Sequence, residues 1–264
     1  MATKYDRIAA DLRRKIQQGE LPPGAQMPVE TVLLREYRVS LATLRRALDQ
    51  LAAEGLIHKQ HGRGTFVRTP RQRLRRTSTR HQWEKDRARL PIGERFGTGS
   101  AERDTGLQMG DFDFSAEYFP DAVADEDLAE AFGIPVGTRL LERTYRTVLK
   151  AEESPLGLGR SFLIYDMIAV NPELLDASSE PWPGGTQNQL YTIGIELDRI
   201  EERVISRPPS LEEAESLRID PGVAVFALRK VSIDTTGRVV EVADSIFGGD
   251  RTELHYVIQL ERWK

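Results

Sequence analysis

The feature that most limits the fold of this chain is a series of three short helical patterns and a hairpin within its first 68 residues. Apolar residues recur every four positions from Ile8 to Ile16, the period of one helix face, and the Pro-Pro-Gly run at 22–24 ends that helix. Pro28 can open a second, shorter helix, because proline lacks an N–H that the first helical turn leaves unpaired. These elements predict a small helical domain, which leaves most of the 264 residues to a second domain.

A third helix is predicted from Ser40 to about Glu54. The Ser40 hydroxyl can accept a hydrogen bond from a first-turn N–H, and leucines follow it at spacings of four and three. Gly55 ends this helix, and the chain then has the pattern of a strand at 56–60, a tight turn, and a strand at 65–68. Three helices and a hairpin are the elements of a winged helix-turn-helix, whose third helix fits the major groove of DNA.

The outer face of the third helix and the turn of the hairpin carry the candidate DNA contacts. Because the inner face of the helix is apolar, its polar side chains are left to face the groove and the phosphates. In the hairpin turn, Gly62 permits a close approach to a groove. The alternatives are solvated helix residues and a solvated turn. The candidates are Ser40, Thr43, Arg45, Arg46, His61, Gly62 and Arg63.

Charge is distributed unevenly along the chain. Residues 1–89 hold 20 Lys and Arg against 9 Asp and Glu, a balance of +11, whereas the remainder holds 17 against 32, a balance of −15. A basic module joined to an acidic one indicates that only the first meets a polyanion. An uneven but merely solvated surface would give the same counts.

Several classes of function are not expected. The chain has no cysteine and only four histidines, so we expect neither a metal site nor a cofactor. It has no apolar run near the roughly 18 residues that span a bilayer, and no signal peptide, so we expect a cytoplasmic protein with no membrane partner. A Gly-rich phosphate loop, a His-Glu-x-x-His motif and a Gly-x-Ser-x-Gly elbow are absent, so an enzyme is not expected.

Residues 4–68 resemble the DNA-binding domain of GntR-type transcription regulators. The resemblance rests on helix residues such as Pro28 with Glu30, and above all on the run Gly-Arg-Gly-Thr-Phe-Val at 62–67. It implies that a homodimer binds an inverted repeat, the operator, in double-stranded DNA. The operator-facing positions that it implies add Glu30, Thr31, Leu41 and Ala42 to the candidate DNA contacts.

The chain departs from the family pattern at positions that read bases. Val29 and Thr31 stand where many members have serine and arginine, and Leu41 stands where many have arginine. The operator sequence of the family therefore does not carry over to this chain.

The stretch 69–94 is interpreted as a linker. Nine basic residues lie between positions 68 and 89 with almost no apolar periodicity. Such a segment either adds phosphate contacts or is a solvated tether. No site residue is assigned to it.

Residues 95–264 have a different pattern. Alternating apolar residues typical of strands occur at 112–114, 140–148, 162–165, 223–233, 239–247 and 254–260, and helical patterns occur at 125–132, 187–193 and 210–217. The pattern predicts an α+β fold with a mostly antiparallel sheet. A helix, a turn and a strand follow one another twice, from 125 and again from 210, which is consistent with a duplicated unit.

This second region resembles the UTRA effector domain of the HutC subfamily, whose fold is similar to chorismate lyase. The resemblance rests on Leu141 with Arg143, on Leu190-Tyr191, and on Glu241 four residues after Gly237. It implies a domain that dimerises and holds a small-molecule effector. The implied pocket residues are Arg143, Tyr145, Ser161, Glu241 and Phe247.

The implied pocket departs from that of many relatives, which use two arginines two residues apart and a tyrosine for anionic sugar-like ligands. Tyr145 replaces the second arginine here and Phe247 replaces the tyrosine, so we expect a ligand with a polar or anionic group and an apolar portion. Arg143 can hold an anion with two hydrogen bonds and Glu241 can accept from hydroxyls. The alternative is that the two form a structural pair between strands.

These observations predict a homodimeric transcriptional repressor that a small molecule releases from its operator. Residues 80–85 and 102–107 also resemble transfer-control repressors of conjugative plasmids, which gives an alternative without an effector, in which the second domain only dimerises. A DNA-architectural protein is the other class, and it would bind DNA without regard to sequence.

Overall fold

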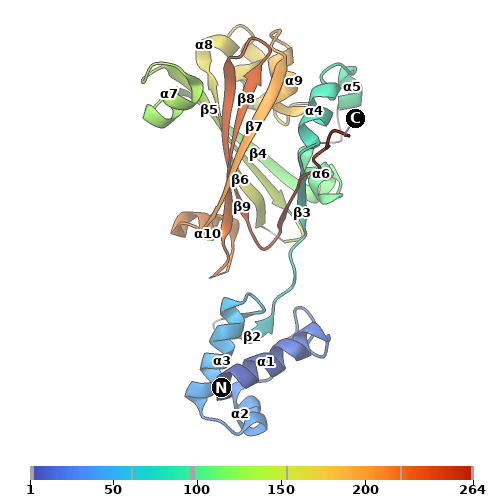
Figure 1. Ribbon diagram of the computed structural model, residues 1–264, viewed down its shortest axis with the longest axis vertical. Helices are drawn as coiled ribbons and strands as arrows, with labels where there is room; N and C mark the ends of the chain where they lie inside the picture. Colours follow the sequence, from blue (N-terminus) through green and yellow to red (C-terminus); the bar gives the residue numbers. More distant parts are fainter. Residues whose placement is uncertain (1–2, 61, 96–98, 153, 221, 263–264) are drawn as a thin grey trace. The chain divides into compact units, whose positions relative to one another are not determined.

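The computed structural model describes residues 3–60, 62–95, 99–152, 154–220 and 222–262. The chain forms two compact units, one of residues 1–71 with 219–223 and one of residues 72–218 with 224–264. The elements of both units are labelled in Figure 1.

The first unit is the predicted winged helix-turn-helix. The helix α1 begins with a capping box, in which the Thr3 hydroxyl accepts from the Asp6 amide and the Asp6 carboxylate accepts from the Thr3 amide. The predicted N-cap at Ser40 is also confirmed, because its hydroxyl accepts from the Thr43 amide at 3.3 Å. The elements are α1 (Lys4–Gln17), α2 (Glu30–Tyr37), α3 (Leu41–Ala53), β1 (Ile57–Gln60) and β2 (Gly64–Val67).

One apolar core holds the first unit together. Ile8 and Leu12 of α1 pack with the leucines on the inner face of α3, which confirms the helical periodicity as a buried face. The antiparallel hairpin pairs Ile57 with Val67, and both side chains join the same core. The wing is thereby anchored to the helix that the sequence predicts to read DNA.

The second unit is built on a six-stranded sheet in which every neighbouring pair is antiparallel. This confirms the predicted α+β class. The strand order is β4 (Phe112–Val123), β5 (Arg139–Leu149), β6 (Ser154–Ile164), β9 (Val239–Gly248), β8 (Val225–Asp234) and β7 (Leu197–Arg207). The remaining elements after β4 are the helices α7 (Glu126–Phe132), α8 (Tyr165–Ile168), α9 (Gly185–Tyr191) and α10 (Leu211–Leu217), two short 3-10 helices at Pro172–Leu175 and Ala177–Ser179, and the strand β10 (Thr252–His255).

The sheet has an internal repeat. The series β4, α7, β5, β6 occupies one half and the series β7, α10, β8, β9 the other, with β6 and β9 paired at the centre. The helix–turn–strand echo in the sequence thus corresponds to equivalent positions of the topology. Pro221, in the second of the two turns, lies outside the described residues.

Two expectations about this region need correction. The strand β7 is not predicted from the sequence. It lies at the edge of the sheet with alternating exposed and partly buried residues, and many of these are charged, so the strand has no alternation of apolar residues. The apolar alternation at 254–260 is a strand only as far as His255, and beyond it the side chains are exposed, because no strand pairs with them among the described residues.

The stretch interpreted as a linker, 69–94, is largely folded into the second unit. It contains β3 (Leu74–Thr77), which pairs in parallel with β10, and α4 (Arg80–Arg87). Two short helices, α5 (Ile92–Arg95) and α6 (Ser100–Thr105), follow, and a 3-10 helix at Met109–Asp111 precedes β4. Figure 1 shows β3, α4 and α6 on one side of the sheet and α7 on the other.

The arginines of this segment give a folded part of the second unit the sequence pattern of a linker. Arg80 and Arg87 are buried, and the Arg76 side chain is only 14% exposed. Ion pairs and ring contacts replace the apolar spacing that would have marked a folded element. The first unit through residue 71 therefore holds 13 basic against 7 acidic residues, a smaller excess than the count to residue 89 implies.

Candidate functional site

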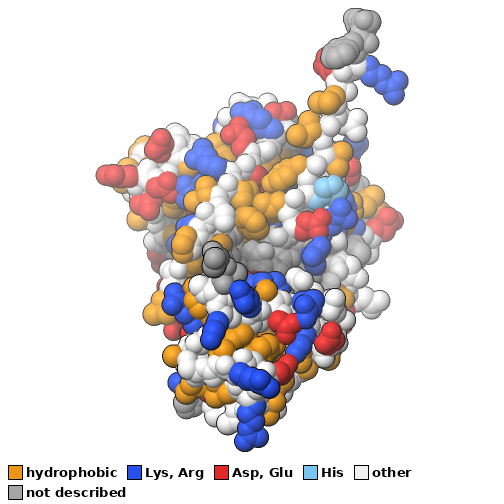
Figure 2. Space-filling model, turned by 60° about the horizontal axis from the view of Figure 1, so that its bottom comes forward, with side chains coloured by type: hydrophobic (Ala, Val, Ile, Leu, Met, Phe, Trp, Pro, Cys, Tyr) orange, Lys and Arg blue, Asp and Glu red, His pale blue; other side chains and the backbone are white. Residues whose placement is uncertain are grey.

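The first turns of α3 carry an exposed face that combines polar and apolar side chains. Leu41, Ala42, Arg45 and Arg46 are exposed, and Thr43 is partly buried beneath the Ser40 cap. Figure 2, which brings the bottom of Figure 1 forward, shows Lys and Arg side chains together with apolar and some acidic ones on the nearer face of the first unit. This face has the positive charge and the small side chains that a DNA groove requires.

Both arginines of this face are held by partners in the same unit. Arg45 donates from Nε and Nη2 to the two oxygens of Glu30 at 3.0 and 3.2 Å, which ties α3 to the first residue of α2. The Arg46 guanidinium lies 4.4 Å from the centre of the Tyr5 ring. The hydrogen bond from Arg45 lowers the pKa of the Glu30 carboxyl. These contacts orient the two arginines without burying their charge.

Apolar side chains stand where the family pattern has polar ones. Leu41 at the start of α3 is 40% exposed, and Val29 before α2 is 56% exposed. Thr31, in the first turn of α2, is exposed as well. Groups of this kind contact thymine methyl groups, whereas arginines pair with guanine.

The wing turn has the backbone geometry expected for a close approach. Gly62 has φ +72°, and a Cβ atom added there would meet nothing within 4 Å. Arg63 is exposed, and its carbonyl accepts from the side-chain amide of Gln26 at 3.0 Å. His61, also predicted to face the operator, lies outside the described residues. The described part of the turn is thus open to a ligand on its outer side.

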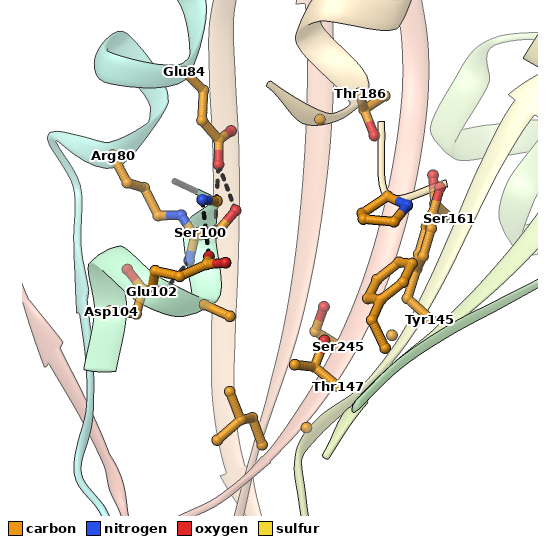
Figure 3. Close-up of a pocket in the computed structure, with 18 of the residues that line it drawn as sticks. Arg80, Glu84, Ser100, Glu102, Asp104, Tyr145, Thr147, Ser161, Thr186 and Ser245 are labelled. Atoms are coloured by element: carbon orange, nitrogen blue, oxygen red, sulfur yellow. Dashed lines mark hydrogen bonds and ion pairs between the residues drawn. The ribbon is translucent and has the colours of Figure 1, made fainter. Parts of the chain in front are cut away.

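The second unit contains a partly open cavity of about 840 Å³. Figure 3 shows its two walls: α4, α6 and the turn before α6 form one, and the sheet with the start of α9 forms the other. The first wall carries charged residues and Ser100, and the second is rich in hydroxyls. A cavity of this size and mixed polarity suits a small organic ligand.

The implied pocket residues divide into two groups. Tyr145, Ser161, Glu241 and Phe247 line the cavity, but Arg143 is not among the described residues that do so. Arg143 lies behind the wall, fully buried. The prediction that it holds an anionic ligand therefore has no support in its position.

Arg143 is the centre of a buried network instead. It donates to Gln189 at 2.6 Å, to Ser161 at 2.8 Å and to Thr186 at 3.2 Å. The Ser161 hydroxyl in turn donates to Glu241 at 2.8 Å, and the Arg143 guanidinium lies 3.6 Å from the same carboxylate oxygen. The strand register explains the cluster, because Arg143 stands opposite Ser161 on the neighbouring strand.

The carboxylate of Glu241 also has several hydrogen-bond and ion-pair partners within the protein. Besides Ser161, its carboxylate accepts from Ser232 at 3.0 Å and forms an ion pair with Lys230 at 2.8 Å. Burial opposes the charge of this carboxylate, but Lys230 and Arg143 outweigh it and lower its pKa to about 2. These contacts match the alternative of a structural pair between strands.

This lowered pKa predicts an acid-sensitive second unit. A carboxyl with a pKa of about 2 when folded and an ordinary value of 4.5 stabilises the fold above about pH 5, and that stability is lost as the pH falls toward 2. The loss from this group is on the order of 3 kcal/mol. We expect urea midpoints to fall between pH 5 and pH 3, with a shallower fall in Glu241→Gln. Equal slopes in both proteins would contradict the assignment.

The wall of the cavity formed by α4 and α6, here called the charged wall, contains no residue that the sequence predicts as a site residue. Arg80, Glu84 and Asp104 line the cavity, and Arg80 donates to Asp104 at 2.6 Å across the space between α4 and α6. One local signal was available, because Arg80 and Glu84 are four apart, as for neighbours on one helix face. The pairing with Asp104 could not be read from spacing.

The comparisons with known proteins agree with this architecture. The model of the bacterial regulatory proteins of the gntR family matches residues 4–67, and the UTRA domain model matches residues 119–253, half of the chain. An HTH-type transcriptional regulator of Rhizobium meliloti is 28% identical over 95% of this chain and 93% of its own length. The HTH-type transcriptional repressor NagR of Bacillus subtilis is 25% identical over 97% of this chain and 95% of its own.

A solved structure covers nearly the whole chain. The crystal structure of a GntR-family transcriptional regulator matches 98% of this chain and 98% of its own, with a TM-score of 0.65 and 26% identity. The relatives named here carry no reference to conjugative transfer, so the resemblance of residues 80–85 and 102–107 to transfer-control repressors finds no support.

The winged helix-turn-helix unit, the α+β unit and the matching relatives, all of them transcriptional regulators, make this chain a two-domain transcription regulator. The chain belongs to the UTRA-domain family, and its first unit is a gntR-family domain. Among the described residues, no helix has the length and apolar character to cross a membrane, and no group of three acidic or histidine side chains is arranged for a metal ion.

Proposed function

We propose that this protein is a transcriptional repressor that binds an inverted-repeat operator in double-stranded DNA as a homodimer. A small molecule in the cavity of the second unit releases it from the operator. The observation that carries the proposal is the presence, in one chain, of an exposed α3 face with two oriented arginines and a cavity of about 840 Å³. The repressor NagR, which is 25% identical to this chain over 95% of its own length, supports the same assignment.

The proposed DNA surface has three parts, each with its own task. The start of α2 supplies Glu30 and Thr31, and the first turns of α3 supply Ser40, Leu41, Ala42, Thr43, Arg45 and Arg46. The wing supplies His61, Gly62 and Arg63. Arginines and hydroxyls position the protein on phosphates, whereas short side chains at the start of α3 contact base edges.

The proposed control by a ligand has a thermodynamic requirement. A ligand that weakens DNA binding must itself bind more weakly when the operator is present, by the same factor. A useful switch requires a coupling of about 1–3 kcal/mol, or roughly five- to 150-fold. Footprinting on the DNA that flanks the gene tests the operator part, and sequence-independent protection would favour the architectural alternative.

Arg45→Ala is expected to weaken operator binding and to reduce its salt dependence. Loss of one phosphate contact lowers the slope of log K against log salt by about 0.9. A gel-shift titration at four salt concentrations measures both quantities. Arg13→Ala is the matched control, because Arg13 forms a similar pair with Glu54, at the other end of α3. If Arg45→Ala changes neither the affinity for the operator nor its salt dependence, Arg45 is not a DNA contact.

Gly62→Val is expected to weaken operator binding about tenfold while the first unit stays folded. A β-branched residue is strained at φ +72°, and its side chain would project where the wing approaches the groove. Gly62→Asn separates the two causes, because asparagine tolerates this φ but still adds a side chain. Circular dichroism checks the fold, and full footprint protection by Gly62→Val contradicts the prediction.

A further inference from the structure

The cations that line the cavity are already paired. Of the six described lysines and arginines in its walls, five form ion pairs with carboxylates, and the sixth, Arg95, donates to the carbonyl oxygens of Leu90 and Ala88. On the charged wall, Arg80 pairs with Asp104 at 2.6 Å, and Arg76 lies 3.6 Å from Glu202. A phosphate needs cations whose charge is not already neutralised. The cavity walls instead present carboxylates, which repel a phosphate.

Three buried polar atoms of this wall lack a hydrogen-bond partner among the described residues, and one of them is Nδ1 of His81. The other two belong to residues that pair with each other. They are Nε of Arg80 and Oδ1 of Asp104, in side chains whose residues are 8% and 5% exposed. Figure 3 shows the two side chains meeting between α4 and α6. Both atoms are covered by neighbouring protein atoms, so a ligand reaches them only if the Arg80 and Asp104 side chains turn toward the cavity. An unpaired buried polar atom is costly, so a ligand that satisfied both atoms would favour that turn.

The two atoms select a ligand by their chemistry. Nε of Arg80 donates and Oδ1 of Asp104 accepts, so their complement is a group that accepts and donates at once. A hydroxyl does both. A phosphate dianion only accepts, and it would lie against the Asp104 carboxylate.

The opposite wall supplies hydroxyls and apolar surface. Thr147 and Ser245 line the cavity from the sheet, and both appear on that side in Figure 3. Beside them, an apolar cluster includes Phe112, Leu156 and Phe247. Hydroxyls on this wall match a ligand with several hydroxyls, and the cluster matches an apolar substituent.

We propose that the ligand of this cavity is an uncharged, polyhydroxylated compound with an apolar substituent, held by Arg80 and Asp104, and not a phosphorylated sugar. This inference rests on the proposed ligand control and deepens it by naming the ligand class. It also assigns the polar contact with the ligand to residues of α4 and α6 in place of Arg143 and Glu241, which form an ion pair with each other.

The test compares matched pairs of probes. The probes are the phenyl β-glycosides of glucose, galactose and mannose, each with its 6-phosphate, together with inorganic phosphate. Trp83 and Trp182 line the cavity, so tryptophan fluorescence of the full chain reports binding directly. We expect at least one neutral glycoside to bind at least tenfold more tightly than its 6-phosphate, and no response to 10 mM inorganic phosphate. Tighter binding of a 6-phosphate, or binding by no glycoside, overturns the proposal.

Two variants assign the contact to the charged wall. Asp104→Asn leaves Arg76 and Arg80 less neutralised, so it is expected to lose at least tenfold in affinity for the neutral glycoside and to gain a response to inorganic phosphate. Thr147→Val removes a hydroxyl from the opposite wall with little change in volume, and it should weaken the glycoside without any gain for phosphate. If Asp104→Asn does not fold, the ligand class is still tested by Thr147→Val and by the binding of each glycoside and its 6-phosphate to the wild-type protein.

The outcomes separate this inference from the proposed function. A 6-phosphate that binds tightly and releases the operator would overturn the ligand class and leave the ligand-controlled repressor intact. If the protein binds the neutral glycoside but protects no inverted repeat in DNA, the proposed repressor function is contradicted and the proposed ligand class is retained.

Discussion

Arg143→Met is expected to lower the free energy of unfolding of the second unit by about 3–5 kcal/mol, because it removes one partner from a fully buried ionic network. Methionine matches the length of the arginine stem but donates no hydrogen bond. Gln189, Ser161 and Thr186 would each lose a donor, and Glu241 would keep only Lys230 as a charged partner. Lysine is not an adequate substitute, because it lacks the planar fork that reaches several acceptors.

Urea unfolding followed by tryptophan fluorescence measures this effect in the full chain. All three tryptophans lie outside residues 1–71, so the signal reports the second unit alone. Arg199→Met is the matched control, because Arg199 pairs with Asp198 and Glu201 on the exposed side of β7. Little change is expected there. Equal midpoints for Arg143→Met and wild type would show that the network contributes nothing to stability.

Leu44→Ala is expected to destabilise the first unit by about 2–5 kcal/mol and to abolish operator binding at 37 °C. Leu44 is 0% exposed in the core between α1 and α3, so its removal leaves a cavity that the neighbouring helices cannot close fully. A domain of this size has only a few kcal/mol of stability in total. The tryptophan-detected transition of the second unit should not change.

Limited proteolysis at the lysines and arginines of the first unit measures the loss, and a gel shift at 20 and 37 °C measures its effect on DNA binding. Leu41→Ala is the control, since it makes the same change in the same helix at a residue that is 40% exposed. It should keep wild-type resistance to protease. A Leu44→Ala protein as resistant as the control would mean that the core tolerates the gap.

The two predictions separate the roles of the units. A lesion in the core of the first unit should remove DNA binding and leave the ligand cavity in place, whereas a lesion in the Arg143 network should loosen the wall behind the cavity. A repressor with such a wall would keep its operator affinity and lose part of its response to the ligand.

The sequence by itself determined the first unit almost completely. Apolar spacing located α1 and α3, Ser40 marked the start of α3, and Gly55 marked its end. These signals are local, because a helix cap and a tight turn are made by residues only a few positions apart. The family resemblance at 62–67 rests on the same kind of short-range pattern.

In the second unit the sequence determined the class of fold. Four of the five residues that the resemblance implies for an effector pocket line the cavity, and their contact with a ligand stays a prediction. Alternation revealed most of the strands but gave neither their order nor the edge strand β7, which is rich in charge. Strand order depends on which faces are buried together, and alternation along one strand does not contain that information.

Only the tertiary structure decided what the charged residues do. Ser161 and Glu241 are 80 positions apart and share a hydrogen bond, and Gln187 donates to the His81 carbonyl from 106 positions away. Such contacts removed Arg143 from the expected ligand site and turned an apparent linker into the charged wall with Arg80 and Asp104. The physical reason is that an ionisable side chain looks the same in a sequence whether it is solvated or buried with a partner, and burial with a partner is a property of the folded chain.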